Sequence, residues 1–271
     1  MGITPVANLP SVGKNLSDQP ALGNAWFVNS NDTLDNITNN ATLRAELLKQ
    51  WKERKTGPLV ASSVSHLAWL RLPANSPIFD SFADPSSGPN TPHCELVIGN
   101  GGGLTPMPGH FMDIGVIVVT PISRGTVSLR STNPLDPPLI DLGFFTSGFD
   151  LFAMREAIQS AIRFVSAPAW KDYVIGPAGD LANATTDVLL EDYARKNAFS
   201  SAHPVGTAAM SAAGARYGVV NPDLRVKGIS GLRVVDASVM PFVTSGHTQA
   251  PVSFRAIGRS IQSKHELAVM A

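Results

Sequence analysis

The chain has 271 residues, of which 44% are hydrophobic and only 15% charged, which is enough to bury a sizeable core in one large domain or two smaller ones. Basic and acidic residues balance at 21 each, so no long-range field would draw the chain to nucleic acid or an anionic membrane. No stretch approaches the roughly 18 apolar residues of a membrane-spanning helix, so we expect a soluble protein with neither partner.

The first half of the chain contains one clear helix. We expect residues 1–20 to form a loop with several turns. A helix is predicted within residues 41–58, where Leu43, Leu47 and Trp51 recur at helical spacing before a Gly-Pro pair. Residues 75–92 are rich in proline, serine and glycine and therefore predict a surface loop.

Strands and helices alternate in the second half, so the fold class is mixed α and β. Residues 110–131 contain two β-branched runs joined at 121–125, which predicts a strand pair, and a proline-punctuated connection follows at 133–145. Further elements are predicted as follows: a helix over 151–165; a helix over 185–198 with Thr186 or Asp187 as N-cap; a buried strand over 232–235 ending at Asp236; and a helix after His247 with Pro251 in its first turn and Phe254, Ile257 and Ile261 on one face.

Several motifs carry little functional weight. The glycines after Ile98 are followed by Pro106 and Pro108 instead of a helix, which disfavours a phosphate-binding loop. The sequence lacks a G-x-S-x-G nucleophile elbow. Cys94 is the only cysteine, and the "HCE" stretch at 93–95 has no partner at metal-ligand spacing, so no metal site is predicted.

Five Asn-x-Ser/Thr sequons occur, although the chain starts without the basic and apolar regions of a secretory signal. They begin at Asn15, Asn31, Asn36, Asn40 and Asn183. Secretion of a longer parent chain would explain both observations, and chance occurrence in polar loops is the alternative. We expect an extracellular glycoprotein.

Two histidines stand apart because each lies among small residues and proline. His203 precedes a proline, which favours extended backbone, and Gly206, Ala208 and Ala209 leave room for a flat group to approach. His247 comes just before a predicted helix whose free N–H groups, around Thr248, would stabilise a group that becomes anionic. One histidine as base beside a second as hydrogen-bond partner makes a plausible site, although loop histidines without function are common.

Four motifs in order resemble the glucose–methanol–choline (GMC) family of FAD oxidoreductases, and most closely its fungal aryl-alcohol oxidase branch. They are "LPSVGKNLSDQP", "HPVGTAAM", "GLRVVDASVMP" and "GHTQAPVSF", and the resemblance runs from Gly2 to Gln262. Family members also carry a G-x-G-x-x-G unit that holds the ADP part of FAD, which this chain lacks. The resemblance therefore implies the C-terminal half of such an enzyme, with an N-terminal FAD-binding half as its missing partner.

The resemblance implies an antiparallel-sheet substrate domain with helices plus the C-terminal part of a Rossmann-like FAD domain. The expected boundaries are an FAD-domain remnant at 1–22, the substrate domain at 23–199 and the FAD-domain part at 200–271. By the same resemblance, His203 is the base that takes the hydroxyl proton of a primary alcohol, and His247 holds the substrate oxygen. The expected FAD contacts are Asp236, Ala237, Thr248, Gln249 and Val252.

Two departures from the family pattern concern the substrate. Asp18-Gln19 stands where many relatives have Asp-His, which we interpret as subfamily variation, and Ala202 replaces the aromatic residue often found before the catalytic histidine. Trp69, Phe111 and Phe199 could line the pocket or belong to the core. The expected reaction oxidises a primary aryl or allylic alcohol with O2 or a quinone as acceptor. Alternatives are a hydroxynitrile lyase of the same family and an inactive fragment acting as a binding protein.

Overall fold

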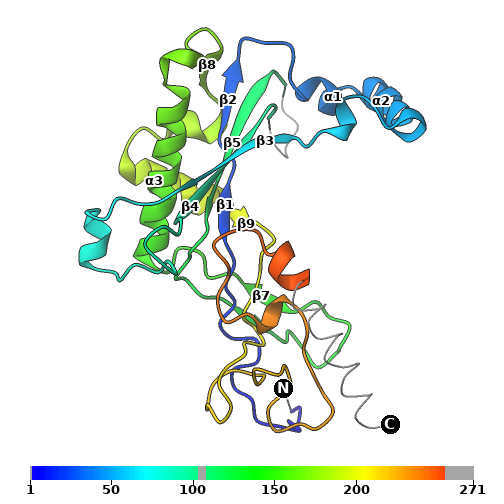
Figure 1. The fold of residues 1–271 in the computed structure, drawn as a ribbon, viewed down its shortest axis with the longest axis vertical. Helices are drawn as coiled ribbons and strands as arrows, with labels where there is room; N and C mark the ends of the chain where they lie inside the picture. The colour runs from blue at the N-terminus through cyan, green and yellow to red at the C-terminus, as the bar shows by residue number, and fades with distance from the viewer. Residues whose placement is uncertain (1, 103–107, 254–271) are drawn as a thin grey trace.

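The main sheet is built around β5 (Phe111–Val118) in the computed structural model of the chain, which describes residues 2–102 and 108–253 (Figure 1). One edge of β5 pairs with β4, and its other edge pairs with β1 and β2, all antiparallel. The remaining strands pair antiparallel at the periphery, β3 with β4, β9 with β1 and β8 with β2. Their bounds are β1 Pro20–Leu22, β2 Ala25–Val28, β3 Val64–Leu70, β4 Cys94–Gly99, β8 Val174–Pro177 and β9 Phe199–Ser200.

One face of this sheet is covered by α3 (Gly148–Val165), which packs on β4 and β5 (Figure 1). Ser147 caps the helix by accepting a hydrogen bond from the Phe149 amide, and the apolar side chains of the helix at Leu151, Met154, Ile158 and Val165 are buried. The core contains Leu96, Met112, Ile114, Val116, Phe149, Met154 and Ile158. α4 (Asp187–Asn197) packs against α3 on this same side.

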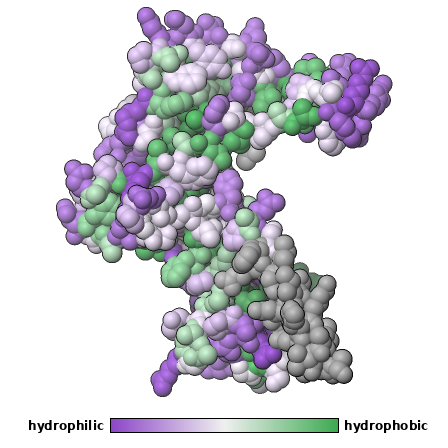
Figure 2. Space-filling model, in the orientation of Figure 1, coloured by the Kyte–Doolittle hydropathy of each residue, from purple (hydrophilic) through white to green (hydrophobic). Residues whose placement is uncertain are grey.

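A second, smaller lobe lies below the sheet, and a helical arm extends from the upper end of the sheet (Figure 1). The lobe is organised around a cluster of Val219, Val220, Leu224, Val226 and Val239, beside the hairpin of β6 (Thr126–Ser128) and β7 (Leu139–Asp141). The arm contains α1 (Asp35–Asn39) and α2 (Ala41–Arg54). Figure 2 shows that the molecule is hollowed between arm and lower lobe, with apolar side chains exposed inside the hollow.

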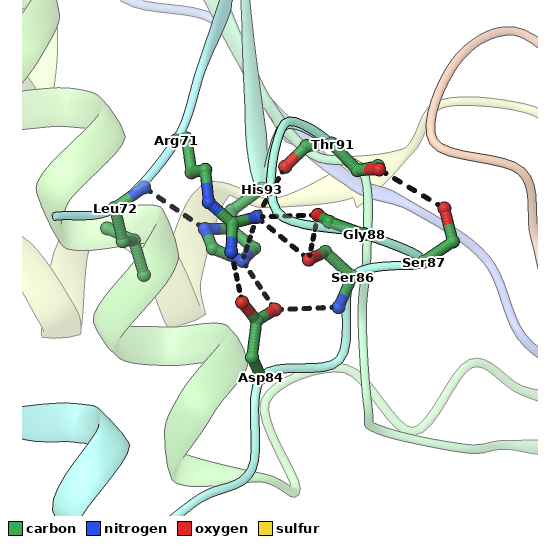
Figure 3. Close-up of polar contacts among 8 residues, drawn as sticks. All are labelled: Arg71, Leu72, Asp84, Ser86, Ser87, Gly88, Thr91 and His93. Carbon is green, nitrogen blue, oxygen red and sulfur yellow. Dashed lines mark hydrogen bonds and ion pairs between the residues drawn. The ribbon is translucent and has the colours of Figure 1, made fainter. Parts of the chain in front are cut away.

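The loop between β3 and β4 is closed by a polar cluster around His93, a fully buried side chain (Figure 3). Nδ1 of His93 accepts the Leu72 amide at 3.0 Å, so the ring proton lies on Nε2, which donates to Asp84 at 3.0 Å. Arg71 pairs with the same carboxylate and donates to the Thr91 carbonyl at 2.7 Å. The prediction of an irregular surface loop is therefore correct, and "HCE" begins with a structural histidine.

The three helix predictions that fall on described residues are confirmed. α2 ends where Lys55 adopts a left-handed conformation, and the N-cap of α4 is Thr186, whose hydroxyl accepts the Leu189 amide. Helical structure begins at Gln249 and is described to Ser253; Phe254, Ile257 and Ile261 lie outside the described residues. Short helical turns are also present: η1 Pro58–Val60, η2 Pro77–Asp80, η3 Pro168–Trp170, η4 Gly179–Asn183 and η5 Ala237–Val239.

Two strand predictions are wrong. β5 and β6 both form but do not pair, because the Asp150 carboxylate binds the amides of Ile122 and Ser123, each at 2.8 Å, and directs the connection away from a hairpin. Residues 232–235 form no strand; a single bridge from Arg233 to Arg225 is present. Within the described residues, no helix is long and apolar enough to cross a membrane.

The buried His93 predicts a loss of stability in mild acid. Burial lowers the pKa of His93 below its ordinary 6.5, so below that pH the unfolded chain binds a proton that the folded chain does not. His93→Gln leaves the Leu72 amide without its acceptor, which costs about 1–3 kcal/mol at pH 7, but it removes the titrating group. Urea unfolding should therefore show a smaller loss of stability between pH 7 and 5.5 in the variant.

The exposed His66 on β3 supplies the control, since His66→Gln removes a histidine without removing a buried contact. It should match the parent chain at both pH values. A His93→Gln variant as acid-sensitive as the parent would contradict the assigned neutral ring.

Candidate functional site

His203 and His247, 44 residues apart in sequence, lie side by side: their ring centroids are 5.2 Å apart and the planes are tilted by 36°. His203 is partly buried just after β9, whereas half of the His247 side chain is exposed. The structure thus brings together the two histidines expected from the sequence. Within the described residues no group of three or more His, Cys, Asp or Glu side chains could hold a metal ion.

The backbone before His203 is held by Asp18, a buried carboxylate at the end of the N-terminal segment. Asp18 accepts the His203 amide at 3.1 Å and a hydrogen bond from the Ser200 hydroxyl. Between these residues Ala202 has φ 62°, a left-handed conformation that is unfavourable for alanine. The carboxylate therefore stabilises a strained turn that presents the His203 ring.

The ring of His203 contacts two side chains through one nitrogen. Nδ1 lies 2.7 Å from Oε1 of the buried Gln19 and 3.1 Å from Oγ of Ser201, while Nε2 has no hydrogen-bond partner among the described residues. Partial burial, with a smaller effect of His247, lowers the pKa of His203, and Asp18 opposes this. The ring is therefore neutral near pH 7 and can accept a proton at Nε2.

The partner of His247 is Glu95, a fully buried carboxylate on β4. Nε2 of His247 lies 3.2 Å from Oε1 of Glu95, and Oε2 has no hydrogen-bond partner in the described part of the chain. Burial raises the pKa of Glu95, and the neighbouring His247 opposes this. The sequence reasoning missed Glu95, although a lone acidic residue inside the apolar run "CELVIG" was the available signal.

Glu95 identifies which face of the sheet the histidines occupy. Its cross-strand partners are Trp69 on β3 and Ile117 on β5, and the row continues through Ala21 to Phe199. Trp69 is 48% exposed and Phe199 45% exposed, so both are available to line a pocket. Phe111 is 1% exposed beneath Phe27 and belongs to the core.

The small residues after His203 serve the protein's own packing. A Cβ on Gly206, which has φ 94°, would lie 2.3 Å from the carbonyl oxygen of Asn15. Ala208 packs on the cluster of the lower lobe. The expectation that these residues make room for a flat ligand is therefore wrong for Gly206. Beside His247, by contrast, a Cβ on Gly246 would meet nothing within 4 Å among the described residues.

The five expected cofactor contacts lie in two places. Asp236 is exposed and caps η5, accepting the Ser238 amide at 2.8 Å, and Ala237 begins that turn. Thr248, Gln249 and Val252 lie in the first helical turn after His247, where the Val252 amide bonds the Thr248 carbonyl at 3.1 Å. The first place lies against the loop after His203, because Ala208 donates to the Ser238 carbonyl at 2.9 Å.

Comparison with known proteins decides the family. The family model described as GMC oxidoreductase matches residues 121–256, a stretch that includes both histidines and all five expected cofactor contacts. The chain belongs to the GMC oxidoreductase family. The resemblance inferred from the four motifs is thereby confirmed.

The GMC relatives in sequence include fungal dehydrogenases. Dehydrogenase eriK of Hericium erinaceus is 42% identical over 261 residues, covering 92% of this chain and 43% of the relative. Pyranose dehydrogenase of Agaricus xanthodermus is 38% identical over 267 residues, covering 93% and 43%. The chain thus spans about 43% of the length of these curated relatives.

The solved GMC structures confirm the expected mixed fold with an antiparallel sheet. A formate oxidase of Aspergillus oryzae, carrying a mutation studied for its effect on FAD modification, superposes on this chain with a TM-score of 0.86 at 26% identity. The match covers 100% of this chain and 50% of that one. A fungal aryl-alcohol oxidase shares the fold, with a TM-score of 0.74 at 24% identity, covering 96% and 48%.

Glu95→Gln should stabilise this GMC chain at alkaline pH. A carboxyl whose pKa is raised on folding contributes stability at low pH and loses it as the pH rises above the ordinary value of 4.5. Replacing it with a neutral amide should raise the free energy of unfolding at pH 8 and leave it nearly unchanged at pH 4.5. Denaturant unfolding at both pH values measures this.

Glu46→Gln, on the exposed surface of α2, is the matched control and should change neither value. If Glu95→Gln were the less stable protein at pH 8, the bond to His247 would outweigh the cost of burying the charge.

Proposed function

We propose that the protein oxidises a primary aryl or allylic alcohol to the aldehyde in an FAD-dependent reaction, with His203 as the base. One observation carries the proposal. The ring of His203, whose Nε2 has no hydrogen-bond partner among the described residues, lies beside His247, and the partner of His247, Glu95, belongs to a sheet face that exposes apolar side chains. A proton acceptor, a second polar ring and an apolar wall are the groups that oxidation of an apolar alcohol requires.

The residues around His247 fit the flavin end of FAD. An added Cβ on Gly246 would meet nothing within 4 Å among the described residues, and the first-turn amides of Thr248 and Gln249 would stabilise negative charge on a flavin ring placed there. Val252, whose amide is bound to the Thr248 carbonyl, would contact that ring through its side chain. We propose Asp236 and Ala237 as contacts to the phosphate and ribityl part. The sequence has no G-x-G-x-x-G unit, so the ADP end would be bound by an N-terminal half of the kind that the relatives' extra length provides.

The two histidines divide the work on the substrate hydroxyl. His203 accepts its proton at Nε2, the only ring nitrogen left free by Gln19 and Ser201. Glu95 engages Nε2 of His247, which leaves Nδ1 of that ring to hold the substrate oxygen. FAD, when bound, supplies the acceptor for the hydride that leaves the carbinol carbon. The final electron acceptor would be O2 or a quinone.

The preference for an aryl or allylic alcohol follows from the exposed side chains. Trp69 and Leu67 on β3 and Phe199 on β9 are exposed on the sheet face that carries Glu95, at the two ends of the β3-β4-β5-β1-β9 row, and each offers apolar surface that suits a flat, unsaturated group. Ala202 leaves the position before the base without an aromatic ring.

We propose residues 1–22, 23–199 and 200–271 as the domains of the chain. β1 ends at the first of these boundaries and β9 lies at the second, and the two strands pair with each other.

The His203→Ala variant tests the base. Visible absorbance of the purified chain incubated with FAD first measures flavin binding, with the missing N-terminal half added if the chain stays colourless. Anaerobic reduction of the bound flavin by an aromatic alcohol should then slow by about 10²–10⁴-fold in His203→Ala, the range of a lost general base. His66→Ala, on an exposed edge strand, should reduce at the parent's rate.

Unchanged reduction in His203→Ala would refute the base assignment. A preparation that binds no FAD even with the N-terminal half would refute the oxidase. Cyanide release from mandelonitrile without flavin bleaching would indicate the lyase chemistry of the family instead.

We further propose that the protein acts outside the cell as a glycoprotein, carrying glycans at the exposed sequons. Asn15 is excluded as a glycosylation site because its side chain bridges two other segments of the chain. Its Nδ2 donates to the Pro241 carbonyl at 3.2 Å, and its Oδ1 accepts from Arg124 at 3.1 Å. Glycopeptide mass spectrometry of the natively secreted protein should find modification among Asn31, Asn36, Asn40 and Asn183 and none at Asn15. A glycan at Asn15, or none at the other four, would contradict the respective assignment.

A further inference from the structure

We propose that Gln19 is a positioning residue that selects the tautomer of His203, with the proton on Nδ1 and the lone pair on Nε2. The inference deepens the proposed function, because it explains how the assigned base presents its basic nitrogen to a substrate. It depends on contacts of the protein alone, however, and can be tested without flavin or alcohol.

The orientation of the Gln19 amide is set by backbone carbonyls. The side chain is fully buried between β1 and the segment before His247. Its Nε2 donates to the Thr244 carbonyl at 2.8 Å and to the Val119 carbonyl at 3.1 Å, and a third carbonyl, that of Gly246, lies at 3.4 Å. Carbonyl oxygens only accept hydrogen bonds, so the NH2 group must face them. The amide oxygen therefore faces His203.

This orientation decides which nitrogen of His203 carries the proton. Oε1 of Gln19 can only accept and lies 2.7 Å from Nδ1, so Nδ1 must donate. The Ser201 hydroxyl, 3.1 Å from the same nitrogen, can accept a weaker share of that proton. A neutral imidazole has one N–H, and Nε2 is consequently the unprotonated nitrogen. This is the less common tautomer of free histidine, so the protein has to select it.

The backbone of His203 is held separately from its ring. Asp18 binds the His203 amide at 3.1 Å, and the Ser201 amide donates to the Gln19 carbonyl at 3.2 Å, a contact that any residue at position 19 retains. Two consecutive residues thus act differently: Asp18 fixes the backbone at His203, and the side chain of Gln19 determines which ring nitrogen of His203 carries the proton. A change of the Gln19 side chain can therefore alter the tautomer without removing the bonds that place the ring.

Within residues 2–102 and 108–253, few charged and titratable groups face His203. Asp18 lies on the N-terminal segment, and His247 lies on the loop before the last described helix, with Glu95 behind it on β4. None of them contacts Nδ1 of His203, whose two partners are the neutral side chains of Gln19 and Ser201. A carboxylate introduced at position 19 would therefore be the first negative charge on that nitrogen.

The test is long-range proton–nitrogen NMR of the chain labelled with ¹⁵N-histidine, which distinguishes protonated from unprotonated ring nitrogens. In the parent protein, Nδ1 of His203 should be protonated and Nε2 unprotonated at pH 8. Gln19→Leu should shift the ring toward a mixture of tautomers, whereas Ser201→Ala, which removes the other contact to Nδ1, should retain the parent pattern. Gln19→Glu should raise the pH midpoint of His203 by about 1 unit or more, since an opposite charge within hydrogen-bond reach favours the cation.

A proton on Nε2 in the parent protein, or a larger tautomer change in Ser201→Ala than in Gln19→Leu, would overturn the proposal. Should Gln19→Leu fail to fold, the parent spectrum and the Gln19→Glu midpoint still decide it, and an unchanged midpoint counts against it. The function is tested separately by His203→Ala. If the parent protein shows the expected tautomer and His203→Ala retains full turnover, the base assignment is refuted and the role of Gln19 stands.

Discussion

The site depends on the hydrogen bonds between Asp18-Gln19 and the turn at 200–203. These two segments are about 180 residues apart in sequence, and the short pairing of β1 with β9 brings them together. Without this pairing, nothing would stabilise the left-handed conformation of Ala202. The His203 ring would also lose its position and its hydrogen bond to the Gln19 amide oxygen. The buried sheet, the lower lobe and the histidine pair all meet at this junction.

The two faces of the main sheet are used differently. The face under α3 is a closely packed apolar core, and the polar cluster around His93 beside it has its hydrogen bonds satisfied. The other face carries a buried carboxylate with an unpartnered oxygen, at Glu95, beside half-exposed aromatic rings. The face under α3 therefore stabilises the fold, whereas the opposite face carries the unfavourable burial of the Glu95 carboxyl, as expected where a scaffold supports a reactive site.

Much of the scaffold could be predicted from the sequence, because helices such as α3 leave a periodic apolar pattern and a capping residue. The positions of His203 and His247 in loops of small residues were also visible. The Glu95–His247 contact was not, because it depends on the register of β4 against β3 and β5, which no local pattern encodes. Gly206 was misinterpreted for a related reason: the close neighbour that requires glycine is the Asn15 carbonyl, 191 positions away in the numbering. Residues 232–235 have the composition of a strand but lack a neighbouring strand among the described residues.

The separation of β1 from β9 has a consequence for how the protein reaches its active form. Contacts between segments this far apart lose the most chain entropy on closing and are expected late in folding, after the local helices and the β3–β4–β5 meander. The turn that presents His203 would then be among the last parts to become ordered. A chain could acquire most of its secondary structure while its proton acceptor is still misplaced, so spectroscopic folding and chemical competence would follow different time courses.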